Sequence, residues 1–142
     1  MSKSIAKVTK TIISSPNIYK PVGPYSQAVL ANNTLYVSGV LGATPDTKLV
    51  SGAAAQTKQA LENLKHILKA GGSSLAGVVK TTILLANLDD FADVNKVYAE
   101  YFPENAPARA CYQVAKLPMN AAVEIEAVAL SGDLEIKQGL YV

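Results

Sequence analysis

Cysteine and histidine are nearly absent from this chain, which contains one of each in 142 residues. A disulfide within the chain is therefore impossible, and a reducing compartment, the cytosol by default, is the simplest expectation. Cys111 and His66 alone cannot supply the usual ligand sets of zinc, so no metal site is expected. The glycines between Gly71 and Gly77 end a predicted helix and precede a predicted strand. This is the reverse of the order in a phosphate-binding loop, so no nucleotide cofactor is expected.

The sequence also lacks long apolar runs and a dense basic stripe. No stretch of 18 or more apolar residues occurs, and the N-terminus has no apolar core of a secretory signal, so we expect neither a membrane span nor export. The formal net charge is only +2 and the lysines are scattered, which argues against nucleic acid as a partner. The first acid is Asp46, and four lysines precede it, which leaves mitochondrial import open beside the cytosol.

The first part of the chain is rich in strand and loop signals. Thr11–Ser14 is a short β-type run, and three prolines after it forbid a helix and favour an extended loop (Pro16, Pro21 and Pro24). Tyr25–Leu30 and Thr34–Val40 are rich in aromatic and β-branched residues and are predicted to form a hairpin. Asn32 and Asn33 between them can adopt the positive φ values of a tight turn.

Two helices are predicted from the helical spacing of apolar residues. The first covers Ala53–Ala70 and ends at the Gly71-Gly72 pair. The second begins at Asp89 or Asp90, either of which can cap it, and ends before Pro103. Its predicted buried stripe consists of Phe91, Val94, Val97 or Tyr98, and Tyr101.

Three more strands complete the predicted domain. Val78–Ala86 is a nearly continuous β-prone run, which suits a central strand with both faces largely covered. Ala110–Ala115 and Val123–Leu130 are the last two strands. The element order is βββαβαββ, which predicts one α+β domain over residues 1–142 with two helices on one face of a mixed sheet. Residues 1–10 are expected to form a flexible tail.

Arg109 is the only arginine, whereas lysine occurs twelve times. Surface charge could have been supplied by lysine, but only arginine offers a planar fork that grips a carboxylate through two parallel hydrogen bonds. Two interpretations stay open at this point: Arg109 binds the carboxylate of a ligand, or it pairs with a structural acid.

Glu124 and Glu126 alternate with apolar residues in the last strand, so both glutamates are predicted to share one face. That face is either a solvated surface or a place where one glutamate lies beside Arg109 on the neighbouring strand and holds or activates a water. Cys111 is two residues after Arg109 and is predicted to share its face. With His66 in a distant helix, a pocket-lining or packing role for Cys111 is favoured over a redox or covalent one.

Five segments, in this order, closely resemble the RidA (YjgF/YER057c/UK114) family over about residues 12–130. They are Gly23-Pro24-Tyr25-Ser26-Gln27-Ala28, Tyr36-Val37-Ser38-Gly39, Asp90-Phe91-Ala92-Asp93-Val94-Asn95, Pro107-Ala108-Arg109-Ala110-Cys111 and Val123-Glu124-Ile125-Glu126-Ala127. The resemblance implies a chorismate-mutase-like fold assembled as a homotrimer, with pockets in the clefts between subunits. It also implies deamination of 2-iminobutanoate and 2-iminopropanoate to 2-keto acids and ammonia without a cofactor, which protects pyridoxal-phosphate enzymes from damage.

Carried onto this sequence, the resemblance implies that Arg109 clamps the substrate carboxylate and that Glu124 positions or polarises the attacking water. Four further residues would shape the pocket and bind substrate: Tyr25, Ser38, Asn95 and Cys111. The chain departs from many relatives at Val40, where a glutamine commonly follows the glycine, and substrate preference is expected to shift there. Two other functions stay open: a small-carboxylate-binding or chaperone-like protein, and an endoribonuclease or translation inhibitor.

Overall fold

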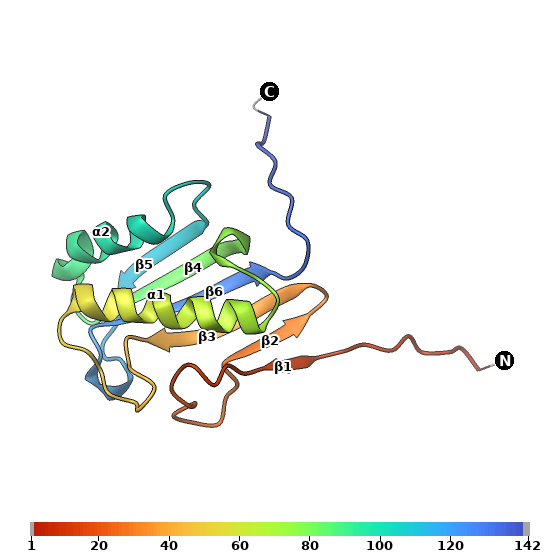
Figure 1. Ribbon diagram of the computed structural model, residues 1–142, viewed down its shortest axis with the longest axis horizontal. Coiled ribbons are helices and arrows are strands. Elements are labelled where there is room, and N and C mark those ends of the chain that lie inside the picture. Colours follow the sequence, from red (N-terminus) through yellow and green to blue (C-terminus); the bar gives the residue numbers. More distant parts are fainter. Residues whose placement is uncertain (1, 141–142) are drawn as a thin grey trace.

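Two α-helices cover one face of a six-stranded sheet in the computed structural model, which describes residues 2–140 (Figure 1). The helices are α1 (Ala53–Ala70) and α2 (Phe91–Tyr101). The strands are β1 (Thr11–Ile13), β2 (Ala28–Ala31), β3 (Thr34–Leu41), β4 (Val78–Leu85), β5 (Ala108–Gln113) and β6 (Val123–Leu130). Their order in the sheet is β1-β2-β3-β6-β4-β5, and only the β4–β5 pair is parallel. The predicted α+β class and element order are therefore confirmed.

Strand boundaries differ from the predicted ones where tertiary pairing overrides local propensity. β5 was expected at Ala110–Ala115 but starts two residues earlier, because it pairs with β4 from Lys80↔Ala108 to Leu85↔Gln113 and ends where β4 ends. β2 was expected to start at Tyr25 but starts at Ala28, since its first ladder partner on β1 is Ile13. Residues 2–10 extend away from the sheet without helix or strand (Figure 1).

The start of α2 also differs from the prediction. A short 3-10 turn (Leu88–Asp90) leads directly into the helix, and neither Asp89 nor Asp90 forms a side-chain cap. Instead the Asn87 side chain accepts a hydrogen bond from the Asp89 backbone N–H at 2.9 Å. Phe91, expected in the buried stripe, is 39% exposed.

The core lies between the helices and one face of the sheet. Leu61, Leu64 and Leu68 of α1 are fully buried together with Leu35, Ile83 and Ile125 of the central strands. The other face of the sheet is largely uncovered and carries exposed Tyr36, Tyr112 and Leu130. The expectation that β4 is covered on both faces is therefore wrong for a single chain, where Val79 and Lys80 are exposed.

Asn63 is one of three buried polar residues of α1, with Gln56 and Thr57, and it fixes the end of β3. Its amide nitrogen donates to the carbonyl oxygens of Leu41, at 3.0 Å, and Ala43, at 2.8 Å, while its side-chain oxygen accepts from Gln59. Asn63 is only 1% exposed, so these carbonyls have no ready access to water in its place.

Replacing Asn63 with alanine should lower the free energy of unfolding by about 2 kcal/mol or more, because two buried carbonyls lose their donor. Urea unfolding followed by circular dichroism measures this. Gln59→Ala, which removes only the partner of the Asn63 side chain, should cost less than about 1 kcal/mol. Equal effects of the two substitutions would contradict the assigned role of Asn63.

Candidate functional site

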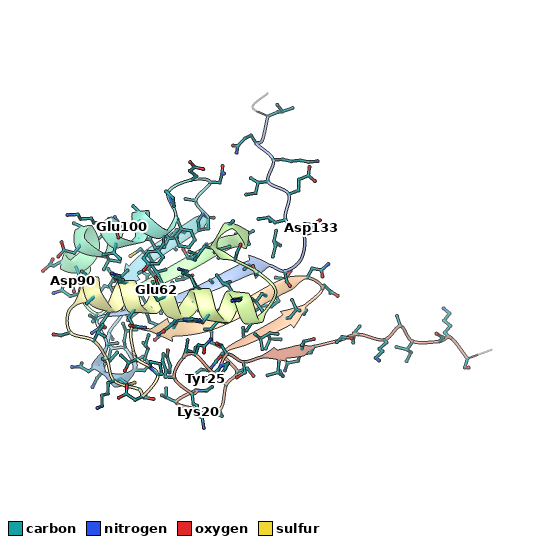
Figure 2. The ribbon with its side chains drawn as sticks, in the orientation of Figure 1. Lys20, Tyr25, Glu62, Asp90, Glu100 and Asp133 are labelled. Atoms are coloured by element: carbon teal, nitrogen blue, oxygen red, sulfur yellow. The ribbon has the colours of Figure 1, made fainter. Side chains whose placement is uncertain are left out.

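The six predicted site residues lie in two groups on opposite faces of the sheet. Tyr25, Ser38 and Glu124 line one cavity on the face away from the helices. Arg109, Cys111 and Asn95 belong to β5 and α2 on the helix side. In Figure 2, Tyr25 lies in the loop before β2, and Asp90 at the left edge marks the start of α2.

A β-bulge in β3 builds the floor of the first cavity. Val37 pairs with Ala127 and Val40 with Ile125, so Ser38 and Gly39 together oppose one residue of β6. The Glu124 side chain lies against Gly39, where an added Cβ would collide with its carboxylate. Glycine at position 39 is therefore what leaves room for the glutamate. The cavity has a volume of about 170 Å³ and is lined by Val22, Tyr25, Ser38, Gly39, Leu41, Pro118 and Glu124.

Buried hydrogen bonds hold the loop that forms one wall of this cavity. The Gln27 side chain accepts from the Ser15 backbone N–H at 2.7 Å and donates to the carbonyls of Ser15 and Tyr19. The Tyr19 hydroxyl accepts from the Leu41 N–H at 2.8 Å, and Ser38 Oγ donates to the Ser26 carbonyl at 2.6 Å. Sequence reasoning missed Gln27 and Tyr19 as supporting residues, because their partners become apparent only in the folded loop.

Glu124 is half-buried, and its surroundings favour the protonated form. Burial raises the pKa of the Glu124 carboxyl above its ordinary value, and repulsion from Glu126 adds to this rise. The carboxyl can therefore exchange a proton closer to neutral pH than an exposed glutamate can. Tyr19 beside it stays a neutral phenol, since burial raises its pKa to about 12.

Arg109 lies in register with Thr81 of β4 and is directed toward α2. Its guanidinium carbon is 4.9 Å from the ring centroid of Tyr98 and 5.8 Å from that of Phe91. The ion pairs among residues 2–140 all involve lysines, and none includes Arg109. Pairing with a structural acid, one of the two interpretations of this arginine, therefore finds no support.

The expectation that a glutamate lies beside Arg109 on a neighbouring strand is wrong. β4 separates β5 from β6. Arg109, Thr81 and Ala127 form one row across the sheet, and the last two are buried on the helix side. Glu124 is three residues from Ala127, so period-two alternation directs it to the opposite face.

Cys111 and Asn95 share the surroundings of Arg109. Cys111 follows on the same face of β5, and burial raises the pKa of its thiol, an effect that Arg109 partly offsets. The thiol therefore stays protonated and is a poor nucleophile. Asn95 is half-buried on α2, one turn after Phe91 and one turn before Tyr98, so all three residues lie on one stripe of the helix.

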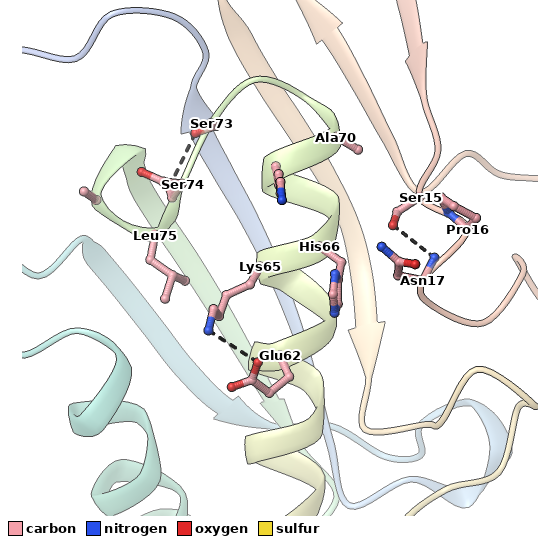
Figure 3. A pocket seen from close by; sticks show the side chains of 12 residues that line it. Ser15, Pro16, Asn17, Glu62, Lys65, His66, Ala70, Ser73, Ser74 and Leu75 are labelled. Atoms are coloured by element: carbon pink, nitrogen blue, oxygen red, sulfur yellow. Dashed lines mark hydrogen bonds and ion pairs between the residues drawn. The ribbon is translucent and has the colours of Figure 1, made fainter.

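A larger cavity than the one beside Glu124 lies elsewhere, along the outer side of α1 (Figure 3). It is an open groove of about 920 Å³ between the Ser15–Asn17 segment and the Ser73–Ala76 segment, and it contains none of the six predicted residues. His66 lines it and is exposed on α1, away from Cys111. Within residues 2–140 no three His, Cys, Asp or Glu side chains gather in a way that could hold a metal ion.

Comparison with known proteins gives one consistent family. A family model described as Endoribonuclease L-PSP matches residues 15–131. The chain is 49% identical over 132 residues to a human 2-iminobutanoate/2-iminopropanoate deaminase, covering 92% of this chain and 96% of the relative. It is 51% identical over 131 residues to the chloroplastic Reactive Intermediate Deaminase A of Arabidopsis thaliana, covering 91% of this chain and 70% of the relative.

Solved structures share the fold. RidA from an Antarctic Psychrobacter bacterium has a TM-score of 0.83 and 44% identity, with 84% of this chain and 98% of the other covered. Escherichia coli TdcF with bound serine has a TM-score of 0.82 and 33% identity, with 86% of this chain and 99% of the other covered. The chain therefore belongs to the family that this model describes, the RidA family indicated by its five sequence motifs.

Proposed function

We propose that this protein hydrolyses 2-imino acids such as 2-iminobutanoate and 2-iminopropanoate to 2-keto acids and ammonia. The observation that carries the proposal is an arginine that forms no ion pair within residues 2–140, combined with a glutamate whose pKa is raised in a small cavity. The first can bind the carboxylate of an imino acid, and the second can move protons during hydrolysis. Relatives about half identical over most of the chain carry deaminase names.

Arg109 holds the substrate by its carboxylate in this proposal. The planar guanidinium donates two parallel hydrogen bonds to the two carboxylate oxygens, which fixes the position of the neighbouring imine carbon. Asn95 and Cys111, from the same side of the fold, bound the space around that carboxylate. A TdcF structure with bound serine supports this kind of ligand, because serine carries a carboxylate next to a nitrogen-bearing carbon.

Glu124 acts on the water. The ionised carboxylate accepts a proton from water as the water oxygen bonds to the carbon of the protonated imine, and the π electrons of the C=N bond move to nitrogen, which gives a neutral carbinolamine. The protonated carboxyl then gives its proton to nitrogen. The C–N bond breaks as ammonia leaves with the bonding electrons, and the remaining hydroxyl gives its proton to the carboxylate to form the keto group. Tyr25 and Ser38 line the cavity in which this water is held.

The two groups come together between copies of the chain. Arg109 and Glu124 lie on opposite faces of one sheet, so a single chain cannot present both to one small substrate. The uncovered sheet face with Tyr36, Tyr112 and Leu130 offers an apolar surface for association. We propose a homotrimer in which each cleft combines the Arg109 group of one subunit with the Glu124 group of the next.

Location in the cytosol stays a prediction. The plant relative is named chloroplastic, so members of the family occupy different compartments. Among residues 2–140 no helix has the length and apolarity needed to cross a membrane.

Replacing Arg109 with lysine should raise KM for 2-iminobutanoate by about tenfold or more while kcat changes less, because the charge is kept but the bidentate fork is lost. Threonine dehydratase supplies the imine, semicarbazide traps what remains, and the rate of disappearance is measured. Arg109→Ala should lose the acceleration entirely. Undiminished activity in Arg109→Ala would reject the deaminase site, and RNA cleavage lost in that variant would favour a nuclease instead.

The acid limb of kcat/KM should lie above the usual range of a glutamate. Activity requires ionised Glu124, so it falls as the pH drops through the raised pKa of that carboxyl. Glu126→Gln removes the repulsion, lowers the pKa of Glu124 and should move the limb to lower pH. Glu104→Gln, an exposed acid outside the cavity, is the control. If Glu126→Gln does not move the acid limb of the kcat/KM profile, the role of Glu124 as the base is contradicted.

Mixing two inactive variants should restore activity if each cleft combines two chains. Arg109→Ala and Glu124→Gln subunits, unfolded and refolded together in equal amounts, give about a quarter of the clefts both functional groups under random assembly. Separately refolded proteins, combined only afterwards, are the control. Activity that stays at the background level of the control would show that both groups act from one chain.

A further inference from the structure

We propose that Tyr98, together with Phe91, is a positioning residue that holds the Arg109 guanidinium ready for a carboxylate. This inference rests on the proposed function, because it assigns Arg109 its ligand. Neither ring belongs to the six residues that sequence and resemblance single out. Both come from α2, and the guanidinium carbon of Arg109 lies over both rings.

Tyr98 is itself rigidly held. It is buried, at 6% exposure, and its hydroxyl shares a 2.7 Å hydrogen bond with the hydroxyl of fully buried Thr81. Its ring packs on Phe102 with 4.7 Å between the centroids. Thr81 also pairs with Arg109 in the β4–β5 ladder. Thr81 therefore holds Tyr98 in place and is also the ladder neighbour of Arg109, which Tyr98 contacts.

This arrangement suits the guanidinium for a bidentate contact. Aromatic rings attract the guanidinium through its face, which leaves the N–H edge free for a carboxylate. Burial raises the pKa of Tyr98, so its hydroxyl stays neutral. The tyrosine therefore interacts with the guanidinium through the π-face of its ring and does not compete, as an anion, with the carboxylate of a ligand. No ion pair among residues 2–140 draws the guanidinium away.

Phe91 provides the second contact and explains an otherwise unfavourable exposure. It is a large apolar side chain, 39% exposed at the first position of α2. Its ring centroid lies 5.8 Å from the Arg109 guanidinium carbon. The cation therefore gives this partly exposed ring an attractive contact. The two rings also flank Asn95 along the helix, so one stripe of α2 organises this whole half of the site.

The test compares the binding of two probes to the purified assembled protein by calorimetry: 2-ketobutanoate, which carries a carboxylate, and 2-ketobutanamide, which is its neutral analogue. Tyr98→Leu should weaken 2-ketobutanoate binding by about three- to thirtyfold and leave amide binding nearly unchanged. Tyr98→Phe keeps the ring and should retain wild-type discrimination. Phe102→Leu removes a ring from the same cluster without touching Arg109, and it should also keep the discrimination.

If Tyr98→Leu fails to fold, Phe91→Leu takes its place, because the Phe91 side chain is partly exposed. Phe91→Leu should weaken the binding of 2-ketobutanoate by about threefold and leave the binding of the amide unchanged. Unchanged carboxylate binding in the leucine variants, or an equal loss for both probes, would overturn the positioning role. Arg109→Ala separates the two proposals. Wild-type carboxylate binding in Arg109→Ala would refute the proposed function itself, whereas Arg109-dependent binding that ignores both rings would refute only the present inference.

Discussion

Period-two alternation along β-strands decides on which face of the sheet Arg109 and Glu124 lie. In β6 the alternation buries Val123, Ile125 and Ala127 under the helices and directs Glu124 and Glu126 to the other face. Residues paired across neighbouring strands point to the same face of the sheet. Arg109 of β5 is paired through β4 with Ala127 of β6, so it points toward α2. Glu124 and Arg109, the proposed base and carboxylate clamp, are thus kept apart by the same rule that builds the core, and the proposed assembly between chains would bring them together.

The bulge at Ser38 and Gly39 modifies this rule at one place. One extra residue in β3 lets both Val37 and Val40 face the core although they are three residues apart. The same irregularity opens the space that the Glu124 side chain occupies. The packing of the core and the position of the Glu124 side chain therefore depend on a single local departure from regular pairing.

Much of the secondary structure could be predicted from the sequence, because periodicity and turn residues are local signals. The limits of α1 and β6 follow from strong periodicity and from the glycines after α1, and Asn32 and Asn33 adopt the positive φ values expected of the turn. The separation of Arg109 from Glu124 could not be predicted, since the position of β4 between their strands is a property of the sheet order. The hydrogen-bond partners of Tyr98 and Gln27 could not be predicted either, because these partners lie far away in the sequence and meet them only in the folded chain.

The position of Gly39 also limits which walls of the cavity can change between related proteins. Its floor, made by β3 and β6, admits no larger side chain beside the glutamate, so the sheet contributes a fixed chemical element. The remaining walls include Val22 and Pro118, which come from loops outside the ladder. Substitutions in these two loops can therefore alter the shape and polarity of the cavity while Glu124, the proposed acid–base group, stays in place, which would separate the evolution of selectivity from that of catalysis.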